Sequence, residues 1–312
     1  MIEVKDLVKR YRDKVAVDHI SFQIDDGEVV GFLGPNGAGK STTMNILTGY
    51  ISSTQGSVRI DGHDVLEEPR QVKRRIGFLP ENPPLYMDMT VNEYLRFACS
   101  IKSVPKPYQR HIDQICEVVG IGHVQKRLIR NLSKGYKQRT GLAQALVGNP
   151  STIILDEPTV GLDPIQIIGV RNIIKELGNQ GTVILSSHIL SEIQSICKRV
   201  LIINQGIICA DGLIDDLTSG FQGNRCLQVR VSGEREQVLR VLGGVQGAAQ
   251  VEALSTGETG AQDYAIHCVE GMDLRGTVFR TVKDAGLTLL EMKSADLTLE
   301  ELFLRLTVKG EM

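Results

Sequence analysis

Tryptophan is absent from this 312-residue sequence, and aromatic residues make up only 4% of it, so a stacking platform for single-stranded nucleic acid is not indicated. No apolar run approaches the roughly 20 residues that span a bilayer, and the charged N-terminus lacks the apolar core of a signal peptide. The formal net charge of −2 offers no bulk attraction for nucleic acid or an anionic membrane. These absences predict a protein that remains in the cytoplasm and binds no nucleic acid.

Cysteine pairs are lacking too, because the six cysteines are scattered and form no CxxC motif. Disulfide scaffolds and zinc knuckles are therefore poor interpretations, and buried, reduced thiols are expected. The sequence does contain enough apolar residues, 42% of the chain, for sizeable cores. At about 150 residues per domain, the length indicates two domains, or one large and one small.

Short apolar runs separated by turn signals occupy residues 2–32, which predicts strands. The pair Asp61-Gly62 lies between β-rich runs and is a hairpin signal. Helical periodicity dominates residues 90–147. Farther along, the sequence predicts a buried strand in STIILDEP, a helix near residues 165–178, a second buried strand in TVILSSH and a hairpin from VLIINQG and IICADG.

The polar, glycine-containing stretch SGFQGN at residues 219–224 marks a domain boundary. It divides the chain into a first domain of residues 1–220 and a small C-terminal accessory domain of residues 221–312. In the second part the patterns follow the order β-α-β-β-α-β, which predicts a small α+β domain of ferredoxin-like arrangement. STGETGAQ is expected to be a hairpin loop, and TLEELFLRL a last helix.

Residues 34–41 read GPNGAGKS, which fits the phosphate-binding pattern GxxxxGK[ST] between a predicted strand and a predicted helix. Glycines let backbone N–H groups converge on phosphate oxygens, and the positive end of the following helix faces the same anion. Lys40 adds a cation for the β- and γ-phosphates, and the Ser41 hydroxyl can ligate Mg²⁺. The candidate nucleotide-binding residues of this segment are Gly34, Pro35, Asn36, Gly37, Ala38, Gly39, Lys40, Ser41 and Thr42.

Two acidic residues end the buried run TIIL: Asp156 and, directly after it, Glu157. Paired acids are often no more than a solvated strand end. The phosphate-binding loop upstream favours a catalytic interpretation, in which Asp156 holds Mg²⁺ through water and Glu157 polarises the attacking water.

With these motifs in this order, the sequence over about residues 1–218 resembles the ATP-binding subunit of an ABC transporter. The segment LSKGYKQR, residues 132–139, resembles the family's LSGGQ signature and its basic tail. The resemblance implies that Ser133 and Gly135 contact the γ-phosphate bound by the opposite subunit. Lys134 and Tyr136 depart from the pattern, and without the family Ser133 is only a helix N-cap.

Four further features carry the resemblance. Residues 160–163 resemble the D-loop, and His188 matches the histidine that contacts the γ-phosphate. Tyr11 matches the aromatic that stacks on adenine, although a plain strand aromatic is the alternative. Glu81 stands where a glutamine is expected; its carboxylate either ligates the metal or couples to the membrane partner.

Together these observations predict an α/β P-loop NTPase core of the ABC ATPase type with an antiparallel β subdomain and a helical subdomain, plus the C-terminal domain. The resemblance implies Mg²⁺-dependent ATP hydrolysis, with Lys40, Glu157 and His188 as catalytic residues and Ser41, Asp156 and Glu81 at the metal. The implied partners are a membrane permease and a second ATPase chain, identical or paralogous, and the implied location is the cytoplasmic face of the membrane.

The end of the chain resembles ATPases of ABC-2-type exporters, including gliding-motility-associated members. Two competing interpretations stay open: a soluble ABC ATPase that acts on a nucleoprotein or other macromolecule, and a regulatory nucleotide-binding subunit with little turnover. The departures at Glu81, Lys134 and Tyr136 leave room for the second, whereas Glu157 argues against it.

Overall fold

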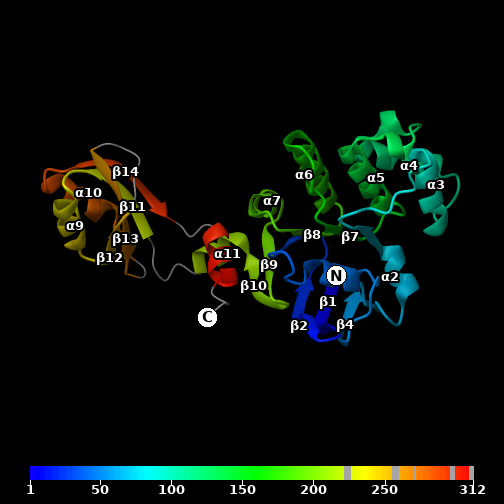
Figure 1. Cartoon of the computed structure of the whole chain (residues 1–312), viewed down its shortest axis with the longest axis horizontal. Helices are drawn as coiled ribbons and strands as arrows, with labels where there is room; N and C mark the ends of the chain where they lie inside the picture. The colour runs from blue at the N-terminus through cyan, green and yellow to red at the C-terminus, as the bar shows by residue number, and fades with distance from the viewer. Residues whose placement is uncertain (221–225, 255–259, 270–271, 296–298, 309–312) are drawn as a thin grey trace. The chain divides into compact units, whose positions relative to one another are not determined.

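The computed structural model describes the whole chain except residues 221–225, 255–259, 270–271, 296–298 and 309–312. It contains two compact units, residues 1–214 and 215–312 (Figure 1). The sequence placed the boundary after residue 220, within SGFQGN, most of which lies outside the described residues. The predicted STGETGAQ loop also lies largely outside them.

A six-stranded sheet forms the centre of the first unit, in the order β10-β9-β3-β8-β7-β6. All neighbouring strands pair in parallel except β10, which runs antiparallel to β9. The strands of its interior are almost wholly buried, as expected for a sheet covered on both faces. The bounds are β3 (Val29–Leu33), β6 (Ile76–Leu79), β7 (Thr152–Asp156), β8 (Thr182–Ser187), β9 (Arg199–Asn204) and β10 (Ile207–Leu213).

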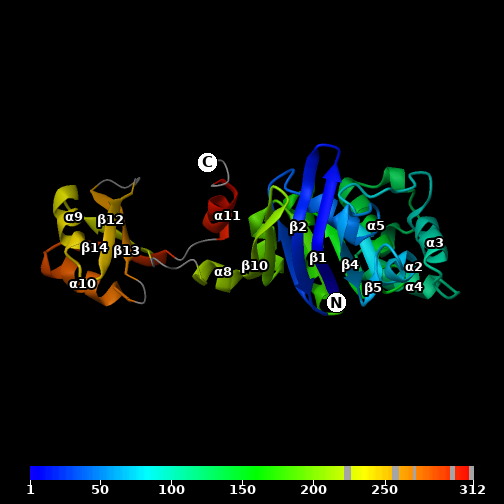
Figure 2. The same ribbon diagram turned by 90° about the horizontal axis from the view of Figure 1, so that it is seen from below.

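An antiparallel sheet packs beside it, in the order β2-β1-β4-β5 (Figure 2). One hydrophobic core is shared by the two sheets and by α1, with Phe22, Phe32 and Met44 among its members. The predicted Asp61-Gly62 hairpin joins β4 to β5 and is confirmed. The bounds are β1 (Ile2–Tyr11), β2 (Lys14–Ile24), β4 (Gln55–Ile60), β5 (His63–Asp64) and α1 (Lys40–Leu47).

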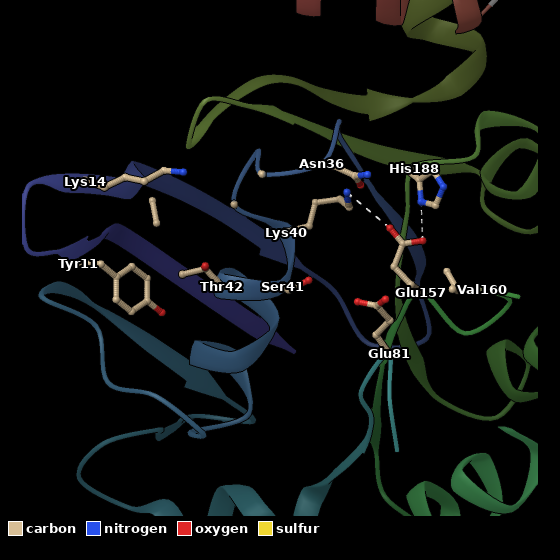
Figure 3. A pocket seen from close by; sticks show the side chains of 13 residues that line it. Tyr11, Lys14, Asn36, Lys40, Ser41, Thr42, Glu81, Glu157, Val160 and His188 are labelled. Atoms are coloured by element: carbon tan, nitrogen blue, oxygen red, sulfur yellow. Dashed lines mark hydrogen bonds and ion pairs between the residues drawn. The ribbon is translucent and has the colours of Figure 1, made fainter. Parts of the chain in front are cut away.

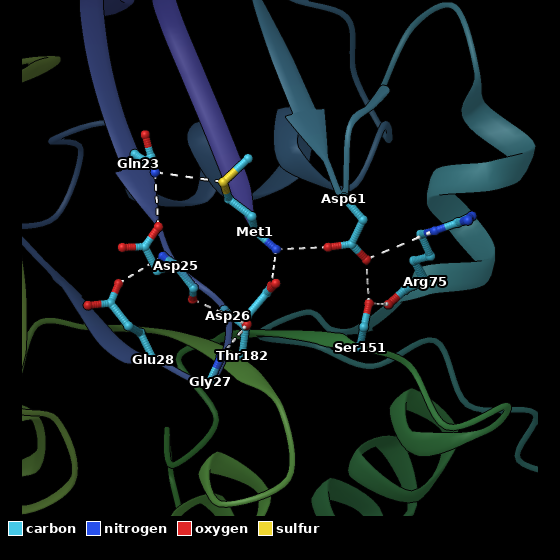
Figure 4. A network of polar contacts seen from close by, with 10 residues as sticks. All are labelled: Met1, Gln23, Asp25, Asp26, Gly27, Glu28, Asp61, Arg75, Ser151 and Thr182. Carbon is cyan, nitrogen blue, oxygen red and sulfur yellow. Dashed lines mark hydrogen bonds and ion pairs between the residues drawn. The ribbon is translucent and has the colours of Figure 1, made fainter.

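A polar network fastens the antiparallel sheet to the rim of the central sheet (Figure 4). The Met1 amino group donates to Asp61 Oδ1 at 2.8 Å and pairs with Asp26. Asp61 also accepts from the Ser151 hydroxyl at 2.7 Å, just before β7. Burial alone would raise the pKa of Asp61, but these two hydrogen bonds hold the pKa of its carboxyl below the usual range.

The helices predicted within residues 90–147 are confirmed as α3 (Val91–Ile101), α4 (Gln109–Val118) and α5 (Lys134–Leu146). A capping box begins α3, because the Thr90 side chain accepts from Glu93 N while the Glu93 carboxylate accepts from Thr90 N. The helix predicted near residues 165–178 is α6 (Pro164–Gly178). Three short helices were not predicted from the sequence: α2 (Pro69–Arg75), α7 (Leu190–Ile196) and α8 (Ile214–Gly220).

The second unit is built around a four-stranded antiparallel sheet in the order β12-β13-β11-β14. Its apolar core lies between this sheet and two helices, with Val229, Tyr264 and Val278 fully buried. The predicted order β-α-β-β-α-β and the last helix are confirmed, while the ferredoxin-like assignment stays a prediction. The bounds are β11 (Cys226–Ser232), α9 (Arg235–Gly243), β12 (Ala248–Ala253), β13 (Ala261–Cys268), α10 (Arg275–Asp284), β14 (Thr288–Ala295) and α11 (Leu299–Val308).

The expectation of buried thiols is confirmed for Cys99, Cys116, Cys197 and Cys268 and is wrong for Cys209, which is exposed. Cys209 lies on β10, an edge strand whose alternating residues face outward. Among the described residues, no helix is long and apolar enough to cross a bilayer.

Candidate active site

The glycine-rich loop joins the end of β3 to the start of α1, as the sequence predicted. Gly37 and Gly39 have φ angles of +80° and +111°, which side chains rarely adopt. A Cβ on Gly39 would lie 2.6 Å from Ala16 O, and a Cβ on Gly34 would collide with Ile203 O. The loop therefore requires glycine at Gly34 and Gly39.

A cavity of about 490 Å³ opens above this loop (Figure 3). Its size lies within the range of small-molecule sites. Ten residues that the sequence assigned to the site line it, and three others join them: Lys14, Ala16 and Val160, the last within the predicted D-loop. The ten are Tyr11, Asn36, Gly37, Gly39, Lys40, Ser41, Thr42, Glu81, Glu157 and His188.

The Glu157 carboxylate lies between two cationic or protonatable groups on one wall of the cavity. Lys40 Nζ is 3.5 Å from Glu157 Oε1, and His188 Nδ1 is 2.8 Å from Glu157 Oε2 (Figure 3). Lys40 Nζ also donates to the loop carbonyls of Gly34 and Pro35, at 2.8 and 3.2 Å. The three predicted catalytic residues thus come together in one cavity.

The backbone at Glu157 takes the left-handed conformation directly after β7, with φ +49°. Non-glycine residues rarely adopt this conformation, and when they do it is frequently at functional sites. The Glu157 N–H donates to Ser186 Oγ at 3.0 Å, which ties this turn to the adjacent strand β8. The turn holds the Glu157 side chain over the cavity.

The predicted metal ligands provide hard oxygen atoms, the type that Mg²⁺ prefers. Ser41 Oγ donates to Asp156 Oδ1 at 3.3 Å, and Asp156 also accepts from Ser186 Oγ. Glu81 lines the same cavity, whereas Asp156 is buried behind Ser41 and does not line it. A hydroxyl, a buried carboxylate and a second carboxylate nearby fit a magnesium ion held partly through water.

The signature residues Ser133 and Gly135 do not line the cavity of their own chain. Ser133 is the N-cap of α5, where its hydroxyl accepts from Tyr136 N at 3.4 Å. Gly135 packs so closely on Gln166 that a Cβ there would collide with it. Tyr136, which differs from the signature pattern, is held by His123, whose Nε2 is 3.0 Å from the tyrosine hydroxyl.

Tyr11 is 47% exposed at the edge of the cavity, and Lys9 Nζ lies 5.1 Å from the centre of its ring. Lys14 and Ala16 were not predicted as cavity residues, because no motif includes them. One signal was available for Lys14. In the β1–β2 hairpin it pairs directly with Tyr11, so a hairpin register would have placed the two side by side.

Several known proteins are similar to this chain. A profile of the ABC transporter family matches residues 17–160. The chain is 32% identical to the bacitracin transport ATP-binding protein BcrA of Bacillus licheniformis, over 99% of this chain and 98% of that protein. It is 31% identical to the linearmycin resistance ATP-binding protein LnrL of Bacillus subtilis, over 98% of each. A solved ATP-binding subunit of an ABC transporter is 31% identical with a TM-score of 0.65, covering 71% of this chain and 93% of that one.

Proposed function

The chain belongs to the ABC transporter family as an ATP-binding, ATP-hydrolysing subunit, and from that premise we propose that it powers export through a separate membrane permease. Its similarity to the bacitracin transport and linearmycin resistance proteins extends over nearly the whole chain. That extent includes the C-terminal unit, which supports membership of the same class of ABC-2-type exporter ATPases. The cargo contacts would belong to the permease.

The observation that carries the mechanism is the Glu157 carboxylate held between Lys40 and His188. We propose that the triphosphate replaces this carboxylate as the partner of both Lys40 and His188. Lys40 and the loop amides then neutralise the phosphates, and His188 contacts the γ-phosphate. Glu157, released from both contacts, orients the water and accepts its proton as the water oxygen bonds to the γ-phosphorus and ADP leaves.

Ser41 and Asp156, with Glu81 in the same cavity as Ser41, would hold Mg²⁺, which when bound offsets the charge of the β- and γ-phosphates. Tyr11 lies at the edge of the cavity, where the adenine ring can stack on its face. Lys14, its neighbour on β2, extends into the same part of the cavity (Figure 3).

We further propose that two ATPase chains, identical or paralogous, close over ATP. Ser133 and Gly135 lie away from their own cavity, and they would meet the nucleotide held by the partner, with the positive end of α5 facing its γ-phosphate. In this proposal residues 1–220 are the motor, residues 221–312 are an accessory domain, and the dimer works at the cytoplasmic face of the membrane.

The permease is proposed to dock on the helical region, where a group of apolar side chains reaches the surface. Tyr86 and Phe97 meet edge to face, with ring centres 5.4 Å apart. Met87, which follows Tyr86 in the chain, is also exposed, and so is Ile101, one helical turn beyond Phe97 on α3. We name these four residues the docking cluster. Exposed apolar groups of this kind are typical of interaction sites.

Purification of the tagged chain from membranes tests this proposal. The chain should bring with it a protein with several membrane spans, and Phe97→Asp should abolish the association. Phe279→Asp is the matched control, because Phe279 is an exposed phenylalanine of α10 in the second unit and should have no effect. Recovery of the chain only with ribosomes or DNA would support the soluble alternative instead.

A further inference from the structure

A buried carboxylate with no role in the proposed mechanism lies behind the cavity. Glu192, on α7, is 2% exposed. Its Oε2 atom accepts from Thr159 Oγ1 at 2.7 Å and from Ser187 Oγ at 3.1 Å. Arg171 Nη2 of α6 is 3.8 Å from its Oε1 atom. None of these four residues lines the cavity.

The two hydroxyls that Glu192 binds belong to the two loops that carry catalytic residues. Thr159 lies two residues after Glu157 in the turn that follows β7. Ser187 ends β8 and directly precedes His188, and its Oγ atom also accepts from Ile189 N at 3.0 Å. The Glu192 carboxylate therefore joins the loop of the proposed base to the loop of the proposed histidine.

These loops have a second link on the cavity side, the 2.8 Å contact between His188 and Glu157. In the mechanism above this contact breaks, because His188 turns to the γ-phosphate and Glu157 turns to water. The link through Glu192 has no reason to break, since its atoms are buried and do not face the cavity. Together with the hydrogen bond from Glu157 N to Ser186 Oγ, it thus remains as a connection between the two loops at the moment of hydrolysis, and it alone reaches Ser187, the residue before His188.

The position of Glu192 is itself fixed by close packing. A Cβ added to Gly31 in β3 would lie 2.6 Å from Ile193 Cγ2 and 3.4 Å from Cys197 Sγ. The helix α7 therefore rests directly on the strand that leads into the glycine-rich loop. Close-packed contacts of this kind leave little freedom for displacement, so the carboxylate is held in a fixed place relative to the central sheet.

We propose that Glu192 is a positioning residue for ATP hydrolysis, which holds the Glu157 and His188 loops at a fixed separation while their side chains release each other. This inference rests on the roles assigned to Glu157 and His188 in the proposed function. It predicts a defect in turnover and not in nucleotide binding, because the glycine-rich loop and Lys40 belong to a different segment.

The test uses Thr159→Val and Thr159→Ser in the full-length chain. Valine keeps nearly the shape of threonine but removes the hydroxyl that Glu192 binds, whereas serine keeps the hydroxyl. A displacement of about 1 Å at a reacting group can lower a rate about a hundredfold. We expect Thr159→Val to lower kcat at least about tenfold with KM and Kd for ATP within about twofold, and Thr159→Ser to restore kcat.

A double substitution shows whether Thr159 acts through Glu192. If it does, Thr159→Val should lower kcat much less in the Glu192→Met background, which has no oxygen to accept from Thr159, than in the wild-type chain, because contacting residues show non-additive effects. Equal effects in the two backgrounds would overturn the inference. So would a wild-type kcat in Thr159→Val, or a loss confined to ATP affinity.

A failure of the proposed function would give a different result. The wild-type chain would then hydrolyse no ATP, or its ATP hydrolysis would not be abolished by Lys40→Ala. In that case hydrogen exchange of the Ile189 amide tests whether Glu192 connects the two loops. The exchange should be faster in Thr159→Val than in Thr159→Ser. Equal exchange in the two variants would show that Glu192 does not hold the two loops together.

Discussion

Replacing Glu157 by glutamine is expected to separate ATP binding from hydrolysis. The substitution keeps the size of the side chain and removes the negative charge that lies 3.5 Å from Lys40 Nζ. A glutamine at this position cannot accept the proton of the attacking water. The variant should therefore bind ATP and release almost no phosphate.

The structure gives the direction and scale of both effects. General-base catalysis contributes about 10²–10⁴-fold to a rate, so kcat should fall by that factor. At an effective dielectric constant of about 20, opposite charges 3.5 Å apart attract by about 5 kcal/mol before desolvation is counted. This attraction competes with the phosphates for Lys40. If about 1.4 kcal/mol of it is relieved, ATP binds about tenfold more tightly.

Equilibrium titration with a fluorescent ATP analogue and a phosphate-release assay measure the two quantities on the same sample. Glu176→Gln is the matched control, because Glu176 is an exposed residue of α6 away from the cavity. It should change neither quantity. Steady-state hydrolysis by Glu157→Gln within about tenfold of the wild-type rate would refute the assignment of Glu157 as the base.

Two further predictions concern the division of the chain and its response to pH. Residues 1–220 alone should retain ATP binding, because every phosphate and metal motif lies within them; a fragment that is folded by circular dichroism but fails to bind would contradict this. Burial lowers the pKa of Lys102 from 10.5 to about 8, so between these values the unfolded chain holds a proton that the folded chain has lost. The free energy of unfolding should therefore rise with pH across this window, by at most about 3 kcal/mol, and urea titrations should show that Lys102→Met removes this rise.

Sequence reasoning predicted those parts of the site whose chemistry is local. The glycine-rich loop lies within residues 34–41, and Asp156 and Glu157 directly follow a run of buried strand residues. Each signal needs only a few consecutive residues and their flanking elements. The same holds for the helices of residues 90–147, which are long enough to show apolar periodicity.

The features that were missed either depend on contacts between distant segments or lie in elements too short to show a periodic pattern. Glu192 acquires its partners only when α6, α7 and the ends of β7 and β8 meet, and no motif marks it in the sequence. The helix α2 has seven residues, of which only Val72 is buried. Its sequence therefore shows no helical spacing of apolar residues. Cys209 was misjudged because burial on an edge strand depends on which face is covered.

A mixed dimer tests the central claim, a nucleotide site completed by two chains, most directly. Lys40→Ala breaks the cavity of its own chain, and Ser133→Arg breaks the surface that we propose is offered to the partner. In a dimer of one chain of each kind, the Ser133→Arg chain keeps its own Lys40 and receives an intact Ser133. By the symmetry of such an interface, each variant alone should trap no ATP, and the mixture should trap about one ATP per heterodimer. No trapped nucleotide in mixtures shown to contain heterodimers would contradict the claim.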